Sequence, residues 1–328
     1  METLIDAIAA NLGSWAPPAM VLTFLVASLV IVWRLEAMMQ KGVKGTVLGT
    51  LFMPYFSGLG NLLFVFIALR DETLGGEVFR NVAVNNLTNL TLILGGLGLL
   101  VIITFRESSR TKKKLQEAKL NRLSISLSLL AMIFFAFFTW ALGRDGTLNE
   151  GDGFALIAVF IFWQAFHVYE VLRDNAKGDT GWSPSIWLDL LVIGGASAAT
   201  LVSIEYLVAW ILTLDGRFLS ADNLGLLTGL LMVMPNAMLA GIYAIRGRAE
   251  IAYASQIGDG HICIPLALGI YASFHPLALT TEALWALQLL AVISALHLCF
   301  VIFKKSIPRA FGGFLVVCYG GLLGTGRL

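Results

Sequence analysis

The stretch NVAVNNLTNLTLILG, residues Asn81–Gly95, lies inside an apolar segment that is long enough to cross a lipid bilayer. Asparagine is a poor residue to place in hydrocarbon, yet four of these fifteen residues are Asn and two are Thr. Asn81, Asn85, Thr88 and Asn89 stand at i, i+4, i+7 and i+8, which is the spacing of residues on one face of a helix. Because polar side chains of membrane helices face the bundle interior or a water-filled cavity, the stretch predicts a buried polar face inside a membrane protein.

The composition of the whole chain points to the same class of protein. Of its 328 residues, 58% are hydrophobic and 13% are charged, whereas soluble domains carry about 25% charged residues. A chain this apolar has lipid as its solvent, so we expect membrane lipids as partners. The formal net charge of +1 argues neither for nor against nucleic acid, and no nucleic-acid partner is expected. The three cysteines lie in apolar segments, so no disulfide framework is implied, and the oligomeric state stays open.

Ten segments are apolar over the length that a membrane-spanning helix needs, about 20 residues. They are 18–35, 46–69, 79–104, 123–142, 153–172, 187–213, 223–245, 251–273, 282–303 and 307–325. Most of the 22 Lys and Arg residues fall on one side of this arrangement, and the exceptions are Arg70, Arg80, Arg144, Arg217 and Arg327. Because cytoplasmic loops collect positive charge, we expect both termini outside and loop 105–122 in the cytoplasm. The expected location is a bacterial inner (plasma) membrane.

The two halves of the chain show the same pattern. A helix-breaking residue precedes an Asn at Gly60–Asn61 and at Pro235–Asn236, and each Asn is followed by an apolar helix, a charged turn and a second helix. The second helix carries Asn85 in one half and Asp259 in the other. Because five spans is an odd number, the halves must insert in opposite orientations, as in many secondary transporters. We expect an all-α polytopic membrane protein with ten transmembrane helices in two inverted five-helix repeats.

This pattern divides the chain into an N-terminal surface segment (1–17), a first five-helix repeat (18–172), a cytoplasmic linker (173–186) and a second five-helix repeat (187–328). Gly58, Gly60 and Pro235 are expected to interrupt helical hydrogen bonds and to free backbone carbonyls beside the amides. Amide and carbonyl oxygens are suitable ligands for hard cations. The polar helices of the two halves are therefore expected to form a binding site near the middle of the membrane.

Several motifs carry a resemblance to a known family. They are FSGLGN (Phe56–Asn61) and NVAVNNLTNLTLILG in the first half, and VSIEYLVAW (Val202–Trp210), VMPN (Val233–Asn236) and SQIGDGHICIPLALG (Ser255–Gly269) in the second. These motifs resemble the alpha repeats of the cation/calcium exchanger superfamily, which includes sodium/calcium exchangers. The resemblance implies a secondary active antiporter that works by alternating access, with its ion site between helices two, three, seven and eight.

The resemblance also implies a set of ion- or substrate-binding residues: Ser57, Asn61, Asn85, Asn89, Asn236, Asp259 and Cys263. Asn61 and Asn236 stand where the family has its paired ion-binding glutamates, so Asp259 is the one acid among the matched positions. A divalent ion there would keep about one uncompensated charge, and a charge pair at about 4 Å is worth roughly 4 kcal/mol at an effective dielectric of about 20. Among Na⁺, K⁺, H⁺ and Ca²⁺ as transported ions, we therefore expect monovalent or proton coupling, with no resident cofactor.

Three titratable residues are candidates for proton coupling: Asp259, Glu205 and His261. An acid inside the membrane indicates a functional site by default, and a neighbouring His can tune or relay its proton. Structural interpretations stay open. The asparagines can link helices as packing contacts, Asp259 can be a turn residue, and Glu205 can stay protonated and hydrogen-bonded. His297 is expected to be a packed or interfacial residue.

Other functions remain to be weighed against the antiporter. A neutral, amide-rich cavity also suits a ten-helix carrier of the drug/metabolite type, which exports neutral or zwitterionic solutes. An intramembrane enzyme would use Asp259, His261 and Glu205 as its acid and base groups, but no nucleophile with an adjacent base supports it, so no enzyme is expected. A non-transporting sensor with the same fold is the remaining alternative. The His and Cys spacings match no transition-metal site.

Overall fold

The computed structural model describes residues 7, 10–40, 55, 58–101, 103–104, 112–175, 185–247, 249–304 and 306–324. The first half contains η1 (Gly13–Trp15), α2 (Ala16–Gln40), α5 (Leu59–Ala68), η3 (Glu72–Leu74), α6 (Gly75–Thr88), η4 (Asn89–Ile93), α7 (Leu94–Leu100), β1 (Ile103–Thr104), α8 (Lys112–Leu142), η5 (Gly143–Asp145), β2 (Thr147–Leu148) and α9 (Glu150–Asn175). The second half contains α10 (Ser185–Ile211), η6 (Ala221–Asn223), α11 (Leu224–Ile245), α12 (Ala249–Ile262), η7 (Cys263–Ala267), α13 (Leu268–Phe274), β3 (Leu277–Ala278), α14 (Thr281–Cys299), η8 (Phe300–Lys304), β4 (Ser306–Ile307) and α15 (Arg309–Gly324).

Seven stretches of helix in the described chain are long and apolar enough to cross a membrane, which supports an integral, multi-pass membrane protein. They are Ala10–Met38, Glu72–Leu100, Arg122–Asp145, Ile186–Ile211, Ala221–Ile245, Ile251–Phe274 and Thr281–Lys304. Two shorter apolar helices, Leu59–Ala68 and Arg309–Gly324, lie within the predicted spans 46–69 and 307–325. The predicted span 153–172 is helical in α9.

Two helical stretches form the centre of the bundle. In the most apolar window of Glu72–Leu100, which runs from η3 through α7, 78% of the residues are buried, and the figure for Ile251–Phe274 is 72%. By contrast, 28% of the window in Ile186–Ile211 is buried. The stretch Asn81–Gly95 is thus among the most enclosed parts of the described chain, although it is rich in amides.

The central stretches match one another along the chain. Adding 174 to the bounds of α6, η4, α7 and β1 gives the bounds of α12, η7, α13 and β3. Each stretch is an α-helix broken by five residues of π-helix, which are η4 in the first half and η7 in the second. Sequence reasoning expected interrupted hydrogen bonds at Gly58, Gly60 and Pro235 and did not foresee the π-helical residues. At Pro235, α11 continues as one helix, although proline has no N–H to donate to the carbonyl four residues earlier.

Short strands and close helix contacts join the two halves. β1 pairs antiparallel with β4, with Ile103 opposite Ile307, and β2 pairs antiparallel with β3, with Leu148 opposite Leu277. The last helix, α15, packs against α7 of the first half, while α9 packs against α13 of the second. Both contacts are made at glycines: a Cβ on Gly95 would lie 2.8 Å from the carbonyl of Gly312, and one on Gly269 would lie 3.1 Å from that of Gly153.

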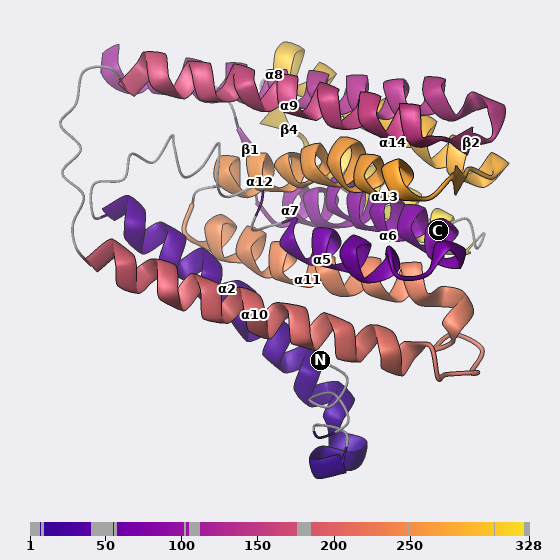
Figure 1. The fold of residues 1–328 in the computed structure, drawn as a ribbon. Coiled ribbons are helices and arrows are strands. Elements are labelled where there is room, and N and C mark those ends of the chain that lie inside the picture. Colours follow the sequence, from indigo (N-terminus) through magenta and orange to yellow (C-terminus); the bar gives the residue numbers. More distant parts are fainter. Residues whose placement is uncertain are drawn as a thin grey trace.

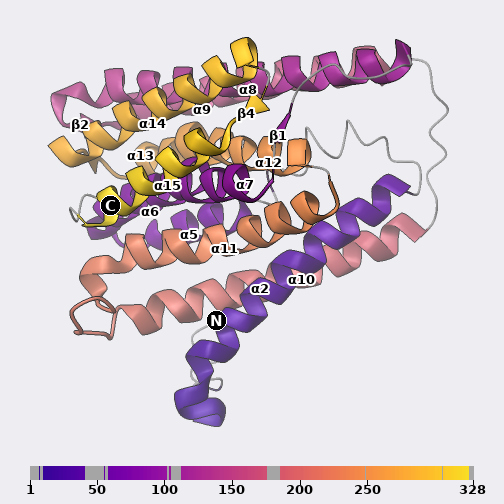
Figure 2. The same ribbon diagram turned by 180° about the vertical axis from the view of Figure 1, so that it is seen from behind.

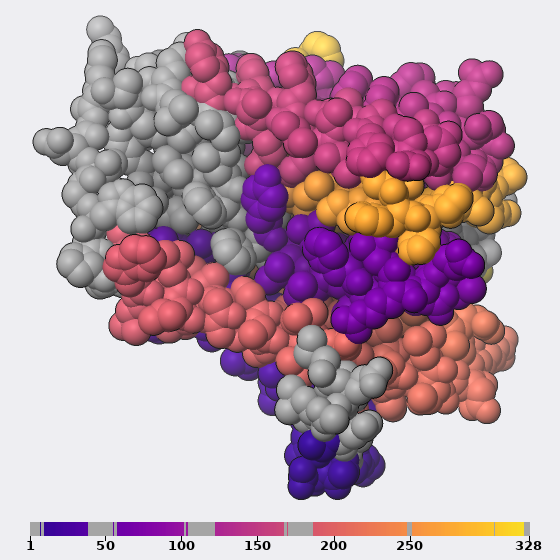
Figure 3. Space-filling model, viewed as in Figure 1, coloured from indigo at the N-terminus to yellow at the C-terminus, as the bar shows by residue number. Residues whose placement is uncertain are grey.

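Two long helices, α2 and α10, form a pair at the edge of the bundle (Figure 1). α2 crosses the other helices obliquely, as the view from behind shows most clearly (Figure 2). In the space-filling view the N-terminal end of α2, in indigo, projects from the lower edge of the molecule (Figure 3). An ion pair at 3.4 Å between Arg34 of α2 and Asp189 of α10 links the two helices.

Candidate functional site

The two central stretches bring together the predicted residues Asn85, Asn89, Asp259 and Cys263. Asn85 Nδ2 donates to Asp259 Oδ2 at 2.5 Å, and Asn89 Nδ2 donates to the same oxygen at 2.9 Å. Asn85 Nδ2 also lies 3.5 Å from Cys263 Sγ. Asn85, Asn89, Asp259 and Cys263 each have 0% exposure. The Asp259 carboxylate of the second half is therefore hydrogen-bonded to amides of the first half.

The geometry of these contacts fixes which way the amides point. A carboxylate oxygen only accepts hydrogen bonds, so the NH₂ groups of Asn85 and Asn89 face Asp259 and their oxygens turn away. Several buried side-chain amide oxygens have no hydrogen-bond partner among the described residues. They belong to Asn61, Asn81, Asn85, Asn86, Asn89 and Gln256.

A buried polar atom without a partner costs about 1–3 kcal/mol, and native proteins leave few such atoms. The unpartnered amide oxygens lie on α5, α6, η4 and α12, and each can accept a hydrogen bond or coordinate a cation. Neutral oxygens on the helices that carry one buried carboxylate are a donor set that suits a small hard cation. The residues present thus fit a cation site with little negative charge.

The two π-turns have a local cause in the sequence. At the third position of η4, the hydroxyl of Thr91 donates to the carbonyl of Leu87, one turn earlier. The matching position of η7 is Pro265, which has no N–H to donate and clashes with the carbonyl four residues before it. Both residues thus act on the carbonyl at the corresponding position of their helix, one turn earlier. π-turns inside α-helices are frequent at functional sites, and these two begin at the site residues Asn89 and Cys263.

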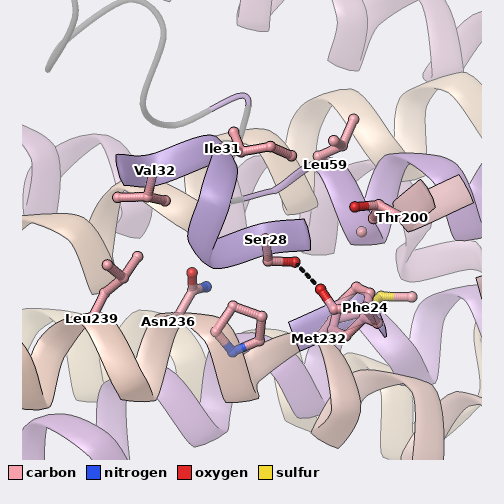
Figure 4. Close-up of a pocket in the computed structure, with 11 residues that line it drawn as sticks. Phe24, Ser28, Ile31, Val32, Leu59, Thr200, Met232, Asn236 and Leu239 are labelled. Atoms are coloured by element: carbon pink, nitrogen blue, oxygen red, sulfur yellow. Dashed lines mark hydrogen bonds between the residues drawn. The ribbon is translucent and has the colours of Figure 1, made fainter. Parts of the chain in front are cut away.

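Asn236 faces a different part of the site. It lines a cavity of about 10 Å³, at the lower limit for one water molecule, between the α2/α10 pair and α5/α11. In Figure 4 its side chain rises from α11 toward Ser28 and Val32 of α2. Ser28 is hydrogen-bonded to the carbonyl of Phe24 at 2.8 Å, and Thr200 of α10 lines the same cavity.

Asn61 lies on α5 with 0% exposure, and neither of its amide atoms has a partner among the described residues. Its neighbour Gly60 lines the Asn236 cavity, and a Cβ there would lie 3.1 Å from Met232 of α11. The two predicted Asn positions therefore belong to adjacent helices at the side of the site nearest α2. Ser57 lies outside the described residues.

Two proton-coupling candidates have contacts that sequence reasoning did not foresee. Glu205 accepts from Arg70 Nη1 at 2.5 Å, although 135 residues separate them, so the acid in α10 has a basic partner after all. His261 directs Nε2 to the carbonyl of Ser128 at 2.8 Å and packs edge-on against Phe135 and Trp163. These contacts turn His261 toward α8 and α9.

Sequence reasoning also missed polar residues that border the site. Gln256 of α12 donates to the backbone carbonyl of Asn236 at 3.1 Å. The hydroxyl of Thr228 on α11 accepts a hydrogen bond from the amide of Asn81 at 3.0 Å. Gln256 stands three residues before Asp259 and so shares its helix face, a signal that helical spacing could have supplied. Among the described residues, no three His, Cys, Asp or Glu side chains cluster as a metal site.

Comparisons with known proteins bear on this geometry. Residues 18–169 match the family described as sodium/calcium exchanger protein. The solved structure of the sodium-calcium exchanger NCX_Mj soaked with 2.5 mM Na⁺ and 10 mM Sr²⁺ has a TM-score of 0.69 and 18% identity, covering 99% of each chain. The same exchanger soaked with 2.5 mM Na⁺ and 0.1 mM Ca²⁺ has a TM-score of 0.68 and 20% identity, covering 94% of this chain and 97% of that one. The curated proteins include no match.

The fold is that of a multi-pass membrane protein similar to the sodium-calcium exchanger NCX_Mj. The family match over the first half and the likeness of fold over the whole chain confirm the predicted resemblance to the cation/calcium exchanger superfamily. They support a cation antiporter and favour a transporter over an enzyme.

Proposed function

We propose that this chain is a secondary active antiporter for a monovalent cation, coupled to a second monovalent cation or to protons. The observation that carries the proposal is the single buried carboxylate of Asp259, held by the amides of Asn85 and Asn89, on helices that also carry buried amide oxygens without partners among the described residues. Neutral oxygens can replace the hydration shell of Na⁺ or K⁺, and one carboxylate balances one positive charge. A Ca²⁺ ion at the same place would keep about one uncompensated charge, at a cost of roughly 4 kcal/mol per charge pair at about 4 Å.

The transport cycle we propose is alternating access by a ten-helix protein of two inverted five-helix repeats, joined by a cytoplasmic linker at 173–186. The common interval of 174 residues between the central stretches supports the repeats. The position of α2 and α10 supports the cycle, because this pair packs at the edge of the bundle and borders the Asn236 cavity. Movement of the pair along α5 and α11 would open that cavity to one side of the membrane at a time.

The ion and the site can be tested in liposomes that contain the purified protein. Uptake of ²²Na⁺, ⁸⁶Rb⁺ and ⁴⁵Ca²⁺ is measured against imposed Na⁺ or pH gradients. We expect coupled flux of a monovalent ion and weak or absent Ca²⁺ exchange. Asp259→Asn removes the charge of the site at constant shape and should lower the flux at least tenfold.

The matched control for this variant is Glu150→Gln, which changes an exposed acid in the first turn of α9. It should transport at the wild-type rate. Coupled flux that survives Asp259→Asn unchanged would remove the proposed site, and rapid Ca²⁺ exchange by the wild type would refute the charge argument. No flux of any of these ions by the wild type would reject the antiporter.

A further inference from the structure

A buried histidine outside the predicted site contacts the π-turn of the first half. His297, on α14, has 0% exposure. Its Nε2 lies 2.9 Å from the backbone carbonyl of Leu90, the second residue of η4. Its Nδ1 is hydrogen-bonded to the hydroxyl of Tyr253 on α12. A carbonyl can only accept, so Nε2 carries the proton, and in the neutral ring Nδ1 accepts from Tyr253.

The π-turn leaves the backbone carbonyl of Leu90 without the donor that an α-helix would supply. In an α-helix the N–H of Leu94 would donate to the carbonyl four residues earlier, which is that of Leu90. In η4 the N–H of Leu94 donates to the carbonyls of Asn89 and Thr91 instead. The ring nitrogen of His297 supplies a donor to the carbonyl that this change releases.

The contacts of His297 close a ring of polar groups through the cation site. From Tyr253 on α12 the ring passes through His297 to Leu90 in η4. Leu90 is bonded to Asn89, whose amide donates to Asp259 on α12. η4 is therefore linked to α12 at two points. Asn89 donates to Asp259, and Leu90 is linked to Tyr253 through the imidazole of His297.

We propose that His297 is a positioning residue for the cation site: by holding the Leu90 carbonyl, it fixes the π-turn in the orientation that points Asn89 at Asp259. This inference rests on the proposed function, because it assigns a role at the same site. A turn released from the imidazole would rotate or return to α-helical bonding. Either change would move the amide of Asn89 away from the carboxylate and weaken cation binding.

The test compares two replacements of His297 in the reconstituted full-length protein. His297→Leu keeps an apolar bulk against Phe311, whose ring centroid lies 5.2 Å from that of the imidazole, but provides no donor. His297→Gln keeps one donor and one acceptor. We expect His297→Leu to raise the KM for the monovalent cation about tenfold, which is about 1.4 kcal/mol of binding, and His297→Gln to stay near the wild-type value.

Ser294→Ala is the matched control, because Ser294 lies three residues earlier on α14, is also fully buried, and its hydroxyl has no hydrogen-bond partner among the described residues. It should leave KM unchanged. Tyr253→Phe removes the partner of Nδ1 and keeps the donor to Leu90, so a smaller rise in KM is expected.

The outcomes separate this inference from the proposed function. A wild type that transports no monovalent cation would reject the function itself. A wild type whose flux is lost in Asp259→Asn, with His297→Leu at the wild-type KM, would overturn the role of His297 and leave the function intact. Equal rises in KM for His297→Leu and His297→Gln would also overturn it, because the inferred role requires only a donor and an acceptor.

Discussion

At the scale of single residues, the proposed site is rich in amides. The resemblance implies that Asn61 and Asn236 stand at the family's two glutamate positions, and the amides of Asn85 and Asn89 donate to the carboxylate of Asp259. An amide supplies an oxygen ligand without a charge, so each replacement lowers the attraction for a divalent ion more than for a monovalent one. The choice between ions should therefore respond to isosteric changes between Asn and Asp.

Asn236→Asp tests this response, since it adds one carboxylate to the Asn236 cavity with almost no change in shape. We expect Ca²⁺ to compete with the monovalent ion at least tenfold more strongly than in the wild type, as measured by inhibition of ²²Na⁺ or ⁸⁶Rb⁺ uptake. Asn149→Asp, which changes an exposed capping residue before α9, should leave the competition as it was. Unchanged Ca²⁺ competition in Asn236→Asp would place Asn236 outside the ion path.

Helical spacing within residues 81–95, together with the match between the two halves, predicted that residues of the two central stretches would meet. Asn85, Asn89 and Asp259 were predicted to meet, and the structure shows their hydrogen bonds. The partner of Glu205 could not be predicted, because Arg70 is 135 residues away and the pair is formed by tertiary packing alone. The role of His297 was hidden for a similar reason: its partner is a backbone carbonyl, which any residue at that position would supply.

At the scale of elements, the close approach of α11 to α6 depends on glycine. A Cβ on Gly225 would lie 2.3 Å from the carbonyl of Glu77, and one on Gly229 would lie 2.8 Å from that of Asn81. Small residues at such crossings let the backbones of membrane helices approach closely. The contact also places the hydroxyl of Thr228 where it accepts a hydrogen bond from the amide of Asn81.

Gly225→Ala should therefore force α11 away from α6 and lower the thermal unfolding midpoint in detergent, since overpacking typically costs about 1–3 kcal/mol. Gly241→Ala is the matched control on the same helix, because a Cβ there would meet nothing within 4 Å. It should leave the midpoint unchanged or raise it, because alanine favours the helix. Equal midpoints for the two variants would show that the crossing tolerates a wider spacing.

The π-turns show what a sequence pattern leaves out at this scale. Pro235 was expected to interrupt a helical hydrogen bond, and the chain stays helical through it, as a proline inside a well-packed membrane helix allows. The changes to π-helical bonding lie elsewhere, in η4 and η7, whose third positions are Thr91 and Pro265. A threonine is a common helix residue in membranes, so Thr91 alone gives little signal. Its match with Pro265 is visible only once the two halves are aligned.

At the scale of the whole molecule, polar contacts between described residues link the α2/α10 pair to the rest of the bundle. Tyr243 of α11 donates to Glu36 of α2, and Arg70, which follows α5, is paired with Glu205 of α10 at 2.5 Å. The Arg70 side chain is 63% exposed and that of Glu205 is 8% exposed. Removing the arginine would therefore leave a buried carboxylate without its partner, and removing the carboxylate would not leave a buried charge.

Arg70→Gln should thus lower the unfolding midpoint more than Glu205→Gln does, because a buried charge that has lost its partner is strongly destabilising. Adding Glu205→Gln to Arg70→Gln should recover most of the loss. Thermal unfolding of the two single variants and the double variant at neutral pH measures both effects. Additive losses in the double variant would mean that the two side chains do not act as a pair.

The strand pairs and glycine contacts between the halves have a consequence for how the protein is made. The amides of Asn81, Asn85 and Asn89 find Thr228 and Asp259 on helices that leave the ribosome much later. The cover over α7 comes from α15, the last helix described. Until the second half is inserted, these amides of the first half therefore lack their partners. We expect this insertion intermediate to be prone to degradation. Neither half expressed without the other would complete its own core, whereas two separately synthesised halves have the complementary surfaces to assemble into one transporter.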